Sequence, residues 1–312
     1  MNCLVTGGAG FIGSNLTKAL LARGHIVRIL DNFSTGKREN LGPYQERVEL
    51  IEGDLRSYHI VHEAVRDIEV VFHQGALPSV PRSINDPITT NQVNVEGTLN
   101  ILDAAKDAGV RRVIYASSSS IYGENPTLPK QEDMTPLPIS PYAVAKLAGE
   151  KYCQAFTRSY GLETVGLRYF NVFGAGQDPK SQYAAVIPLF ITAFLDGGRI
   201  QIHGDGEQSR DFTYIDNVVQ ANMKAAVAEG ASGEVFNVAC GERTSLNQIL
   251  DDLRKVTEVD VDLEYGPDRP GDVKHSLADI SKARDILDYN PAVSAQEGLR
   301  RSVTWYRTAR KQ

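Results

Sequence analysis

The stretch NCLVTGGAGFIG, residues 2–13, decides the fold of this 312-residue chain. A short apolar run leads into three spaced glycines, and a helical pattern follows them directly. Gly7 permits a tight turn, Gly10 lets the backbone approach a phosphate, and Gly13 lets helix and strand pack closely. The N–H groups of a first helical turn also attract negative charge. The stretch therefore predicts a strand, a turn and a helix whose N-terminus faces phosphate groups.

Apolar runs alternate with helical stretches over the first 170 residues. The runs are rich in Val, Ile and Leu without clean alternation, as expected for parallel strands buried on both faces. The predicted strands are Cys3–Thr6, Ile26–Leu30, Val48–Glu52, Val70–His73, Arg112–Tyr115 and Thr164–Arg168. Predicted helices between them include Gly13–Ala22, Val93–Ala108 and Tyr142–Tyr160. We therefore predict an α/β fold with a doubly wound parallel sheet, the Rossmann arrangement.

The pattern changes after Arg168, where a loop rich in Gly, Gln and Asp spans Asn171–Ala185. The later predicted elements are the strand Ile200–His203 and helices at Val186–Leu195, Ser245–Val256, Asp279–Leu287 and Ala295–Arg310. We expect residues 1–170 to form a dinucleotide-binding domain. Residues 171–312 would form mainly a smaller α/β lobe for the substrate, with some elements returning to the main sheet.

Composition argues against several classes of protein. The chain carries 33 Lys and Arg against 39 Asp and Glu, and this net charge of −6 disfavours nucleic acid as a partner. No apolar run approaches the ~20 residues that span a bilayer, so we expect no membrane association. Cys3, Cys153 and Cys240 match neither a disulfide framework nor a zinc pattern, which favours the reducing cytoplasm. His59 and His62 lack an obvious third ligand, so we expect no metal.

Two acidic residues follow predicted strands at positions where a dinucleotide would lie. Asp31 comes 18 residues after Gly13, at the end of the second strand. A carboxylate there accepts hydrogen bonds from the adenosine ribose and repels a 2′-phosphate, which favours NAD over NADP. Asp54 and Leu55 follow the third strand, and we expect them to contact the adenine.

Candidate catalytic residues lie on one helix and one strand end. Tyr142 and Lys146 are spaced i, i+4, so their side chains share a helix face. A nearby ammonium favours phenolate, so we expect Lys146 to lower the pKa of Tyr142 and make it a general base. The serine run 117–120 ends the fifth strand, where a doubly wound sheet binds its ligand.

These motifs identify a family. The sequence resembles the extended short-chain dehydrogenase/reductases, and within them the nucleotide-sugar 4-epimerases. The matches are TGGAGFIG at 6–13, Asp31-Asn32, Gly53-Asp54-Leu55, Ser117–Gly123, Tyr142-x-x-x-Lys146, Leu167–Val172, Arg210-Asp211-Phe212 and Arg269–Asp272. The resemblance covers nearly the whole chain, and the combination is specific for the family but less so for the sugar.

The resemblance implies roles for the matching positions. Tyr142 would be the catalytic base, Lys146 its partner at the nicotinamide ribose, and Ser118 the catalytic hydroxyl. The implied NAD-binding residues are Gly7, Gly10, Phe11, Ile12, Gly13, Asp31, Asn32, Thr35, Gly36, Asp54, Leu55, Gln74, Ala76, Asn94, Ser117, Tyr142, Lys146, Tyr169 and Val172. The implied substrate-binding residues are Ser118, Ser119, Ser120, Asn171, Ala185, Val186, Gln201, His203, Arg210, Arg269, Asp272 and Ser276.

The implied activity is C4 epimerisation of a UDP-hexose through a 4-keto intermediate with tightly bound NAD. Related dehydratases carry an acid pair after the catalytic hydroxyl and decarboxylases a Glu, whereas this chain has Ser119 and Ser120. The stretches 73–87 and 269–280 resemble enzymes that act on UDP-N-acetylglucosamine and UDP-N-acetylgalactosamine. Small Ser276 would leave room for their acetamide.

Several alternatives stay open at this stage. The same machinery could serve UDP-glucose and UDP-galactose, or UDP-glucuronate. An inactive NAD-binding regulator and a net NAD(P)H-dependent sugar reductase are the rival classes. The run His73–Ala76 departs from the usual small residues, which leaves its contacts undefined. Family membership also implies a homodimer, formed through helices 93–108 and 142–160 in a four-helix bundle.

Overall fold

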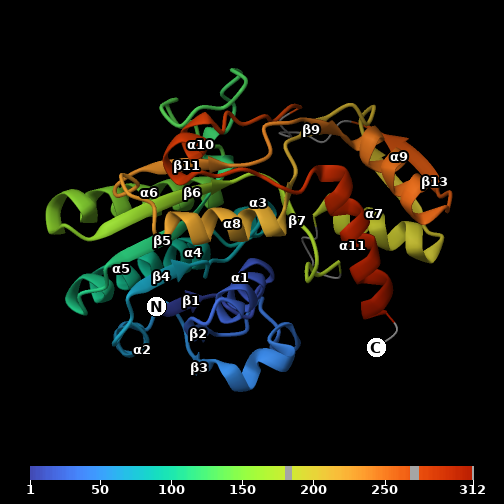
Figure 1. Ribbon diagram of the computed structural model, residues 1–312. Coiled ribbons are helices and arrows are strands. Elements are labelled where there is room, and N and C mark those ends of the chain that lie inside the picture. The colour runs from blue at the N-terminus through green and yellow to red at the C-terminus, as the bar shows by residue number, and fades with distance from the viewer. Residues whose placement is uncertain (180–184, 268–273, 311–312) are drawn as a thin grey trace.

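A seven-stranded parallel sheet forms the centre of the computed structural model, which describes residues 1–179, 185–267 and 274–310 (Figure 1). The strand order is β11-β6-β5-β4-β1-β2-β3. The strands are β1 Asn2–Thr6, β2 Ile26–Asp31, β3 Glu49–Glu52, β4 Val70–His73, β5 Arg112–Ser118, β6 Glu163–Tyr169 and β11 Val235–Val238. The order reverses between β1 and β4, and such a switch point opens a crevice at the carboxyl ends of the strands. The predicted doubly wound sheet is confirmed.

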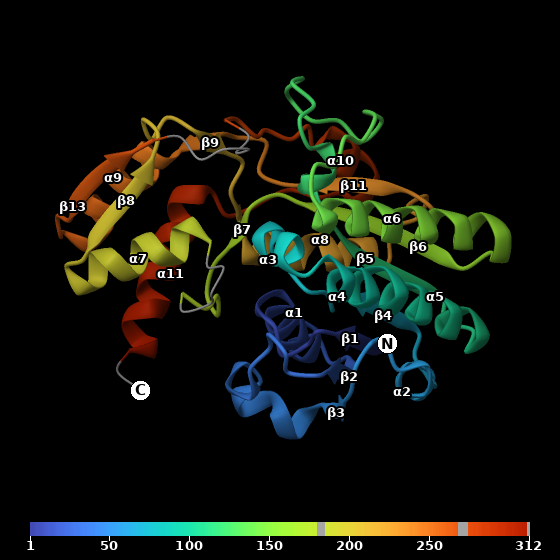
Figure 2. The same ribbon diagram turned by 180° about the vertical axis from the view of Figure 1, so that it is seen from behind.

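Helices cover both faces of this sheet (Figures 1 and 2). On one face lie α1 Phe11–Ala22 and α8 Ile215–Ala225, which pack against each other. On the other lie α2 Tyr58–Ala64, α5 Gly97–Asp107 and α6 Pro141–Tyr160. Two short helices, α3 Val80–Asn85 and α4 Pro87–Asn91, pack against α6, and a π-helical turn, Gln92–Glu96, joins α4 to α5. Shorter 3-10 turns span Arg38–Asn40, Gly42–Arg47 and Ser119–Tyr122.

Most predicted boundaries lie within one or two residues of the observed ones. β4 begins and ends as predicted, whereas β5 runs three residues further and carries Ser117 and Ser118 at the sheet edge. Helix α8 and strand β11 are among the elements that were not predicted. Both come after residue 170, yet β11 pairs with β6 at the edge of the main sheet.

The second half of the chain builds a lobe beside the carboxyl ends of the sheet, at the right of Figure 1. Its helices are α7 Val186–Asp196, α9 Leu246–Thr257 and α11 Ala295–Ala309, and α10 Ser281–Leu287 packs on β11. Strands β8 Arg199–His203 and β13 Asp262–Gly266 pair in parallel. Two-residue strands complete the lobe as the pairs β7 Val172–Phe173 with β10 Thr213–Tyr214, and β9 Ser209–Arg210 with β12 Thr244–Ser245.

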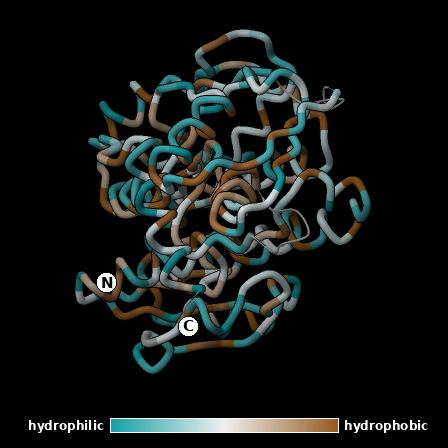
Figure 3. The backbone as a smooth tube through the Cα atoms, turned by 90° about the vertical axis from the view of Figure 1, so that its right-hand side faces the viewer, coloured by the Kyte–Doolittle hydropathy of each residue, from teal (hydrophilic) through white to brown (hydrophobic). Residues whose placement is uncertain are grey.

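One apolar core joins the lobe to the sheet. Buried residues from β1 and α1 belong to the same cluster as Phe173, Ile191 and Leu299 of the lobe. A second cluster lies under α2, α5 and α6. In Figure 3 the hydrophobic segments gather toward the interior of the molecule. The shared core fixes the lobe against the crevice of the sheet. None of the helices in the described ranges is long and apolar enough to cross a bilayer.

Candidate functional site

A cavity of about 890 Å³ opens at the carboxyl ends of β1, β2, β4, β5 and β6. It brings together most of the predicted cofactor residues, although they come from many separate segments. Those lining it are Gly7, Gly10, Phe11, Ile12, Gly13, Asp31, Asn32, Thr35, Gly36, Asp54, Leu55, Gln74, Ala76, Ser117, Tyr142, Lys146 and Tyr169. The cavity lies at the predicted switch point, and its size suits a small-molecule or cofactor site.

The glycine turn at one end of the cavity leaves no room for side chains. A Cβ on Gly13 would lie 2.1 Å from the Gly7 carbonyl oxygen, so helix and turn can meet only through glycine. Gly7 has φ +65° and donates its N–H to Leu30 O at 2.8 Å, which fixes the turn against β2. Gly10 caps α1 without a side chain. The N–H groups of the first turn therefore face the cavity, as a phosphate site requires.

Asp31 is held as a rigid carboxylate on the cavity wall. Its Oδ2 accepts a hydrogen bond from Ala9 N at 2.9 Å, and its Oδ1 accepts one from Phe33 N at 2.8 Å. The residue is only 7% exposed, and a Cβ on Gly36 would come within 3.0 Å of Oδ2. This fixed negative charge fits a ribose with free hydroxyls and opposes a phosphate.

Asp54 lines the cavity beside Asp31 but has protein partners. Its carboxylate accepts hydrogen bonds from Arg56 Nε at 2.9 Å, Arg56 Nη2 at 2.8 Å and Asn32 Nδ2 at 3.0 Å. These contacts, with the Arg56 bond the strongest influence, lower the pKa of Asp54 to about 2. The adenine contact expected of Asp54 stays a prediction, and Arg56 is a partner that the sequence analysis missed.

Two of the three predicted catalytic residues, Tyr142 and Lys146, line the cavity, whereas Ser118 follows the lining residue Ser117 at the end of β5. Tyr142 and Lys146 lie in the first turns of α6, and Ser118 ends β5. The Ser118 hydroxyl lies close enough to Tyr142 to influence the Tyr142 pKa. Lys146 Nζ donates to Ala116 O at 2.7 Å and lies 6.0 Å from the centroid of the Tyr142 ring. Ser118 Oγ also accepts hydrogen bonds from Ser120 N at 3.2 Å and Ser120 Oγ at 2.9 Å.

The expected lowering of the Tyr142 pKa is wrong for the protein alone. Burial raises the pKa of Tyr142, and the Ser118 side chain opposes that rise. Burial also lowers the pKa of Lys146 to about 8, because a low-dielectric site disfavours the ammonium. A helix spacing alone does not report burial, and here burial is the largest cause of both pKa shifts.

The structure defines the contacts of the run His73–Ala76. The buried His73 ring lies between Thr6 Oγ1 at 2.7 Å and Thr98 Oγ1 at 3.0 Å. Burial, aided by the Lys146 charge, lowers the pKa of His73 to about 3, so the ring is neutral. Thr6 Oγ1 in turn accepts a hydrogen bond from Gly75 N at 2.9 Å. His73 thus braces the loop that follows β4 and lines the cavity.

Gln74 joins a closed set of hydrogen bonds at the cavity wall. Its Nε2 donates to Asn222 Oδ1 at 3.0 Å, and its Oε1 accepts from Tyr169 OH at 3.1 Å. Asn222 Nδ2 donates to Tyr169 OH at 2.8 Å. Asn222 comes from the unpredicted helix α8, so the sequence carried no signal for this contact. The set orients the Tyr169 ring, which lines the cavity.

Two predicted cofactor residues do not line the cavity. The buried Asn94 hydrogen-bonds Leu77 through both groups of its amide, with Oδ1 accepting from Leu77 N at 2.7 Å and Nδ2 donating to Leu77 O at 3.0 Å. Asn94 therefore shapes the wall through Leu77, which does line it. Val172 lies in β7, between the sheet and the lobe.

Other lining residues were missed by the sequence analysis. Ser79 has φ +91°, a strained backbone for a residue with a side chain, and strain of this kind gathers at functional sites. Arg82 and Trp305 also line the cavity. Lys37 and Asp178, which also line it, form an ion pair with Nζ and Oδ2 2.6 Å apart. The lone Trp was the available signal, since an aromatic ring on a polar helix face invites a ligand.

The predicted substrate residues are spread over the lobe. Ala185 lines the cavity, and Val186 begins α7. Ser119 and Ser120 begin the 3-10 turn that follows Ser118. Gln201 and His203 are exposed on one side of β8. Arg269 and Asp272 lie outside the described residues.

Asn171, Arg210 and Ser276 gather around β9 and Asp211. Asn171 Nδ2 donates to Asp211 O at 3.1 Å, Arg210 Nη1 donates to Ser209 O and to Lys274 O at 3.0 Å each, and Ser276 N donates to Ser209 O at 3.0 Å. The buried Asp211 carboxylate accepts hydrogen bonds from Cys240 N, Gly241 N and Ala278 N. Burial raises its pKa to about 6. Asp211, which the sequence analysis did not single out, fixes the segment of Ser276 beside Arg210.

A third possible metal ligand near His62 exists in the fold. His62, Asp103 and Asp107 place one ligand atom each within 4.8 Å of one another. Lys106 Nζ, however, contacts the Asp103 carboxylate at 2.7 Å and the Asp107 carboxylate at 3.1 Å. The ammonium already neutralises these acids, so the cluster is occupied by an internal ion pair.

Comparison with known proteins places the chain. Residues 3–239 match the model of the family described as the NAD dependent epimerase/dehydratase family. The chain belongs to this family. The glycine turn, the Asp31 carboxylate and the cavity fit NAD: phosphates at the N-terminus of α1, a ribose at Asp31, and the nicotinamide end near Lys146 and Tyr142.

Relatives that match nearly the whole chain include enzymes named for different UDP-sugars. A UDP-N-acetylglucosamine 4-epimerase from Methanobrevibacter ruminantium, solved with UDP-N-acetylmuramic acid, is 44% identical, with a TM-score of 0.94 and coverage of 99% of this chain and 98% of that one. A Thermus thermophilus UDP-glucose 4-epimerase solved with NAD is 36% identical, with a TM-score of 0.90 and coverage of 99% and 100%. A UDP-glucose 4-epimerase from Mycolicibacterium smegmatis is 38% identical over 98% of this chain and 99% of its own.

The Asp31 carboxylate predicts the choice of coenzyme. In the double variant Asp31→Ala/Asn32→Arg, we expect NAD to bind more weakly and NADP more tightly. The variant removes the charge that opposes a 2′-phosphate and adds one that attracts it. Equilibrium binding of both coenzymes to the stripped protein measures this.

A general loss of structure would weaken both coenzymes together. Opposite movement of the two dissociation constants is therefore the expected signature. Unchanged NAD binding with no gain for NADP would show that Asp31 does not face the ribose.

Proposed function

We propose that this protein interconverts UDP-N-acetylglucosamine and UDP-N-acetylgalactosamine by epimerisation at C4, with NAD held tightly in the cavity. At the coarser level, the protein is an NAD-dependent UDP-sugar 4-epimerase of the extended short-chain dehydrogenase/reductase type. The observation that carries the proposal is that Tyr142 and Lys146 line the same cavity as the glycine turn and Asp31, with Ser118 at the end of the adjoining strand β5.

The residues after Ser118 favour epimerisation over elimination or decarboxylation. Related enzymes that catalyse those reactions carry acidic side chains at positions where this chain has Ser119 and Ser120. Hydroxyls at these positions can hold sugar hydroxyls but cannot donate a proton to a leaving group near neutral pH. The remaining groups therefore favour oxidation and reduction of the sugar at C4 without elimination or decarboxylation.

The chain's own groups provide the acid–base part of the reaction. Tyr142 would accept the proton of the C4 hydroxyl with the help of Ser118. It would return the proton after the 4-keto sugar has rotated to present its other face. Lys146, tied to Ala116 O, brings positive charge to the phenol and would bind the nicotinamide ribose. Bound NAD supplies the hydride acceptor and donor. The half-buried Ser119 and Ser120 would hold the sugar near these groups.

The decisive assay uses the protein as purified. Each of UDP-N-acetylglucosamine, UDP-glucose and UDP-glucuronate is incubated without added coenzyme, and the C4 epimers are separated. We expect epimers of the N-acetylated sugar in greatest yield. If no sugar gives an epimer, the protein would be an inactive NAD-binding regulator. Turnover only with added NAD(P)H would indicate a reductase.

Removal of the Tyr142 hydroxyl should abolish most of the turnover. General acid–base catalysis contributes typically 10²–10⁴-fold, so Tyr142→Phe should lower kcat by at least ~100-fold. Folding and NAD content should persist, because only one hydroxyl is lost. Tyr160→Phe, at the exposed end of the same helix, is the matched control. Near-normal turnover of Tyr142→Phe would remove Tyr142 from its role.

We attribute the proposed preference for N-acetylated UDP-sugars to the small side chain of Ser276. A tyrosine there should fill the space beside the C2 substituent, and overpacking a fitted pocket typically costs ~1–3 kcal/mol. That energy corresponds to roughly 5- to 150-fold, since ~1.4 kcal/mol is a factor of ten. In Ser276→Tyr, kcat/KM for UDP-N-acetylglucosamine should fall by this factor.

UDP-glucose is the internal control for Ser276→Tyr, because its hydroxyl needs less room than an acetamide. Its kcat/KM should stay close to that of the unmodified enzyme. An unchanged ratio between the two sugars would show that another residue forms the wall. The segment of Ser276 lies beside Arg210, which supports its place at the substrate.

We also propose a homodimer that includes α6. Exposed apolar side chains gather on α3, α4 and α6, at Ile84, Ile88, Val144 and Tyr152. Helices α3 and α4 pack against α6, and α4 continues through the π turn into α5. A second copy would bury these side chains in a bundle of four helices. The unpaired cysteines agree with a reducing compartment, so we place the enzyme in the cytoplasm.

A further inference from the structure

We propose that Glu150 and Ser117 are positioning residues, which hold the end of β5 against α6 so that the Ser118 hydroxyl stays within reach of Tyr142. The proposal rests on the function proposed above, because it concerns the geometry of the same catalytic groups. Neither side chain needs to touch the substrate for this role. Glu150 lies one helical turn after Lys146 and two turns after Tyr142.

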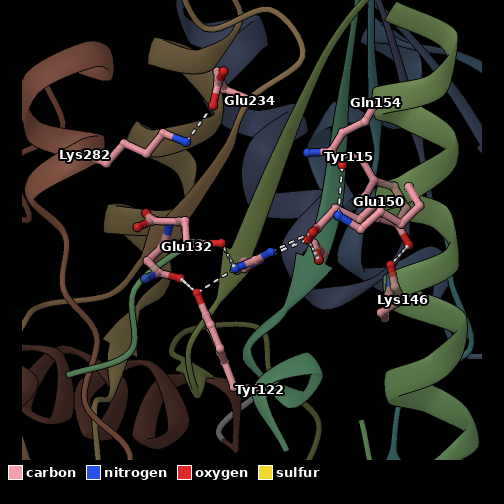
Figure 4. Close-up of polar contacts among 12 residues, drawn as sticks. Tyr115, Tyr122, Glu132, Lys146, Glu150, Gln154, Glu234 and Lys282 are labelled. Carbon is pink, nitrogen blue, oxygen red and sulfur yellow. Dashed lines mark hydrogen bonds and ion pairs between the residues drawn. The ribbon is translucent and has the colours of Figure 1, made fainter. Parts of the chain in front are cut away.

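The Glu150 carboxylate is buried and fully engaged (Figure 4). Its Oε2 accepts hydrogen bonds from Ser117 Oγ at 2.9 Å and from Arg168 Nε at 3.0 Å. Its Oε1 accepts one from Arg168 Nη2 at 2.7 Å. Glu150 is 0% exposed and Arg168 is 2% exposed, so water cannot replace these partners. The carboxylate therefore has one allowed position, between β5 and β6.

The arginine is fixed from its other side. Arg168 Nη1 donates to Tyr122 OH at 2.8 Å and to Glu132 O at 3.1 Å. Tyr122 OH donates to Asn237 Oδ1 at 2.7 Å, which ties the group to β11. Figure 4 shows Tyr122 and Glu132 on the side opposite Glu150. The guanidinium is thus held by Glu150, Tyr122 and the Glu132 carbonyl. Because Glu150 belongs to α6, its bonds to Arg168 fix α6 against β6.

Three successive residues of β5 are tied to α6. Tyr115 OH donates to Lys146 O at 3.2 Å, Ala116 O accepts from Lys146 Nζ at 2.7 Å, and Ser117 Oγ donates to Glu150 Oε2 at 2.9 Å. The third contact is the one adjacent to Ser118. Because consecutive Cα atoms are held ~3.8 Å apart, a fixed Ser117 leaves Ser118 little freedom to move from Tyr142.

Stability does not explain a charge pair at this place. The desolvation of two buried ions can exceed their attraction, and apolar residues of similar volume often serve as well. An ion pair at the other end of the same strands shows the contrast. Arg112 Nε contacts Glu163 Oε2 at 2.7 Å, but the Glu163 side chain is 38% exposed, and Arg112 lies at the opposite end of β5 from Ser118. The directional bonds of Glu150 supply a defined geometry where catalysis needs it.

The first test removes only the Ser117 hydroxyl. Misplacement of a reacting group by about 1 Å can lower a rate ~100-fold. Ser117 lines the cavity, but its hydroxyl donates its hydrogen to Glu150 Oε2. We therefore expect Ser117→Ala to lower kcat by at least ~10-fold while KM for the UDP-sugar and the NAD content of the purified protein stay unchanged. Ser302→Ala is the matched control, because Ser302 is also fully buried and its hydroxyl bonds a backbone carbonyl inside α11.

The two serine variants separate a local effect from a general one. Both lose one buried hydroxyl, so their melting temperatures should fall by similar amounts. A kcat of Ser117→Ala equal to that of Ser302→Ala would overturn the proposal. A loss of NAD from Ser117→Ala alone would also overturn it, since Ser117 would then act as a direct cofactor contact.

The second test removes the charges together. In Glu150→Leu/Arg168→Met no buried charge is left unpaired, so the protein can remain folded. We expect kcat to stay at least ~10-fold below the unmodified enzyme even if the melting temperature is restored. A stable double variant with normal kcat would show that the pair only supports the fold. If this variant does not fold, Ser117→Ala decides the question.

The unmodified enzyme distinguishes this proposal from the proposed function. Absence of C4 epimers with unmodified protein would refute the function. Epimerisation by unmodified protein together with full activity of Ser117→Ala would refute only the positioning role.

Discussion

The buried ion pair between Glu150 and Arg168 constrains how α6 packs on the central sheet. Glu150 and Arg168 must satisfy each other, and the geometry of their hydrogen bonds leaves one arrangement of α6 against β5 and β6. Tyr142 and Lys146 belong to the same helix, so their place above the strand ends follows from it. The ion pair therefore connects the packing of the sheet to the position of the catalytic groups.

A second constraint of opposite character acts at the other end of the cavity. There the fold requires glycine, because a Cβ on Gly13 would lie 2.1 Å from the carbonyl oxygen of Gly7. Close backbone contact turns the N-terminus of α1 toward the cavity, and the Asp31 carboxylate lines the same cavity. Between these two ends, neutral His73 and the Gln74–Tyr169–Asn222 set shape the wall.

The sequence predicted the features that depend on local pattern. The buried strands, the glycine turn, Asp31 and the Tyr142–Lys146 spacing are all local, and the structure places them in one cavity. Features that depend on distant partners were missed or wrong. Asn94 hydrogen-bonds Leu77 and does not line the cavity, and burial reverses the expected shift of the Tyr142 pKa. Helix α8 gave no strong signal, so its contact with Gln74 could not be predicted.

The central claim is that hydride leaves and returns to the same carbon while the cofactor stays bound. UDP-N-acetylglucosamine labelled with deuterium at C4 tests it most directly, with the purified enzyme, ordinary water and no added coenzyme. The account predicts that both C4 epimers at equilibrium keep the deuterium at C4, because the hydride never exchanges with solvent. Loss of the label to water, or a requirement for added coenzyme in stoichiometric amount, would contradict it.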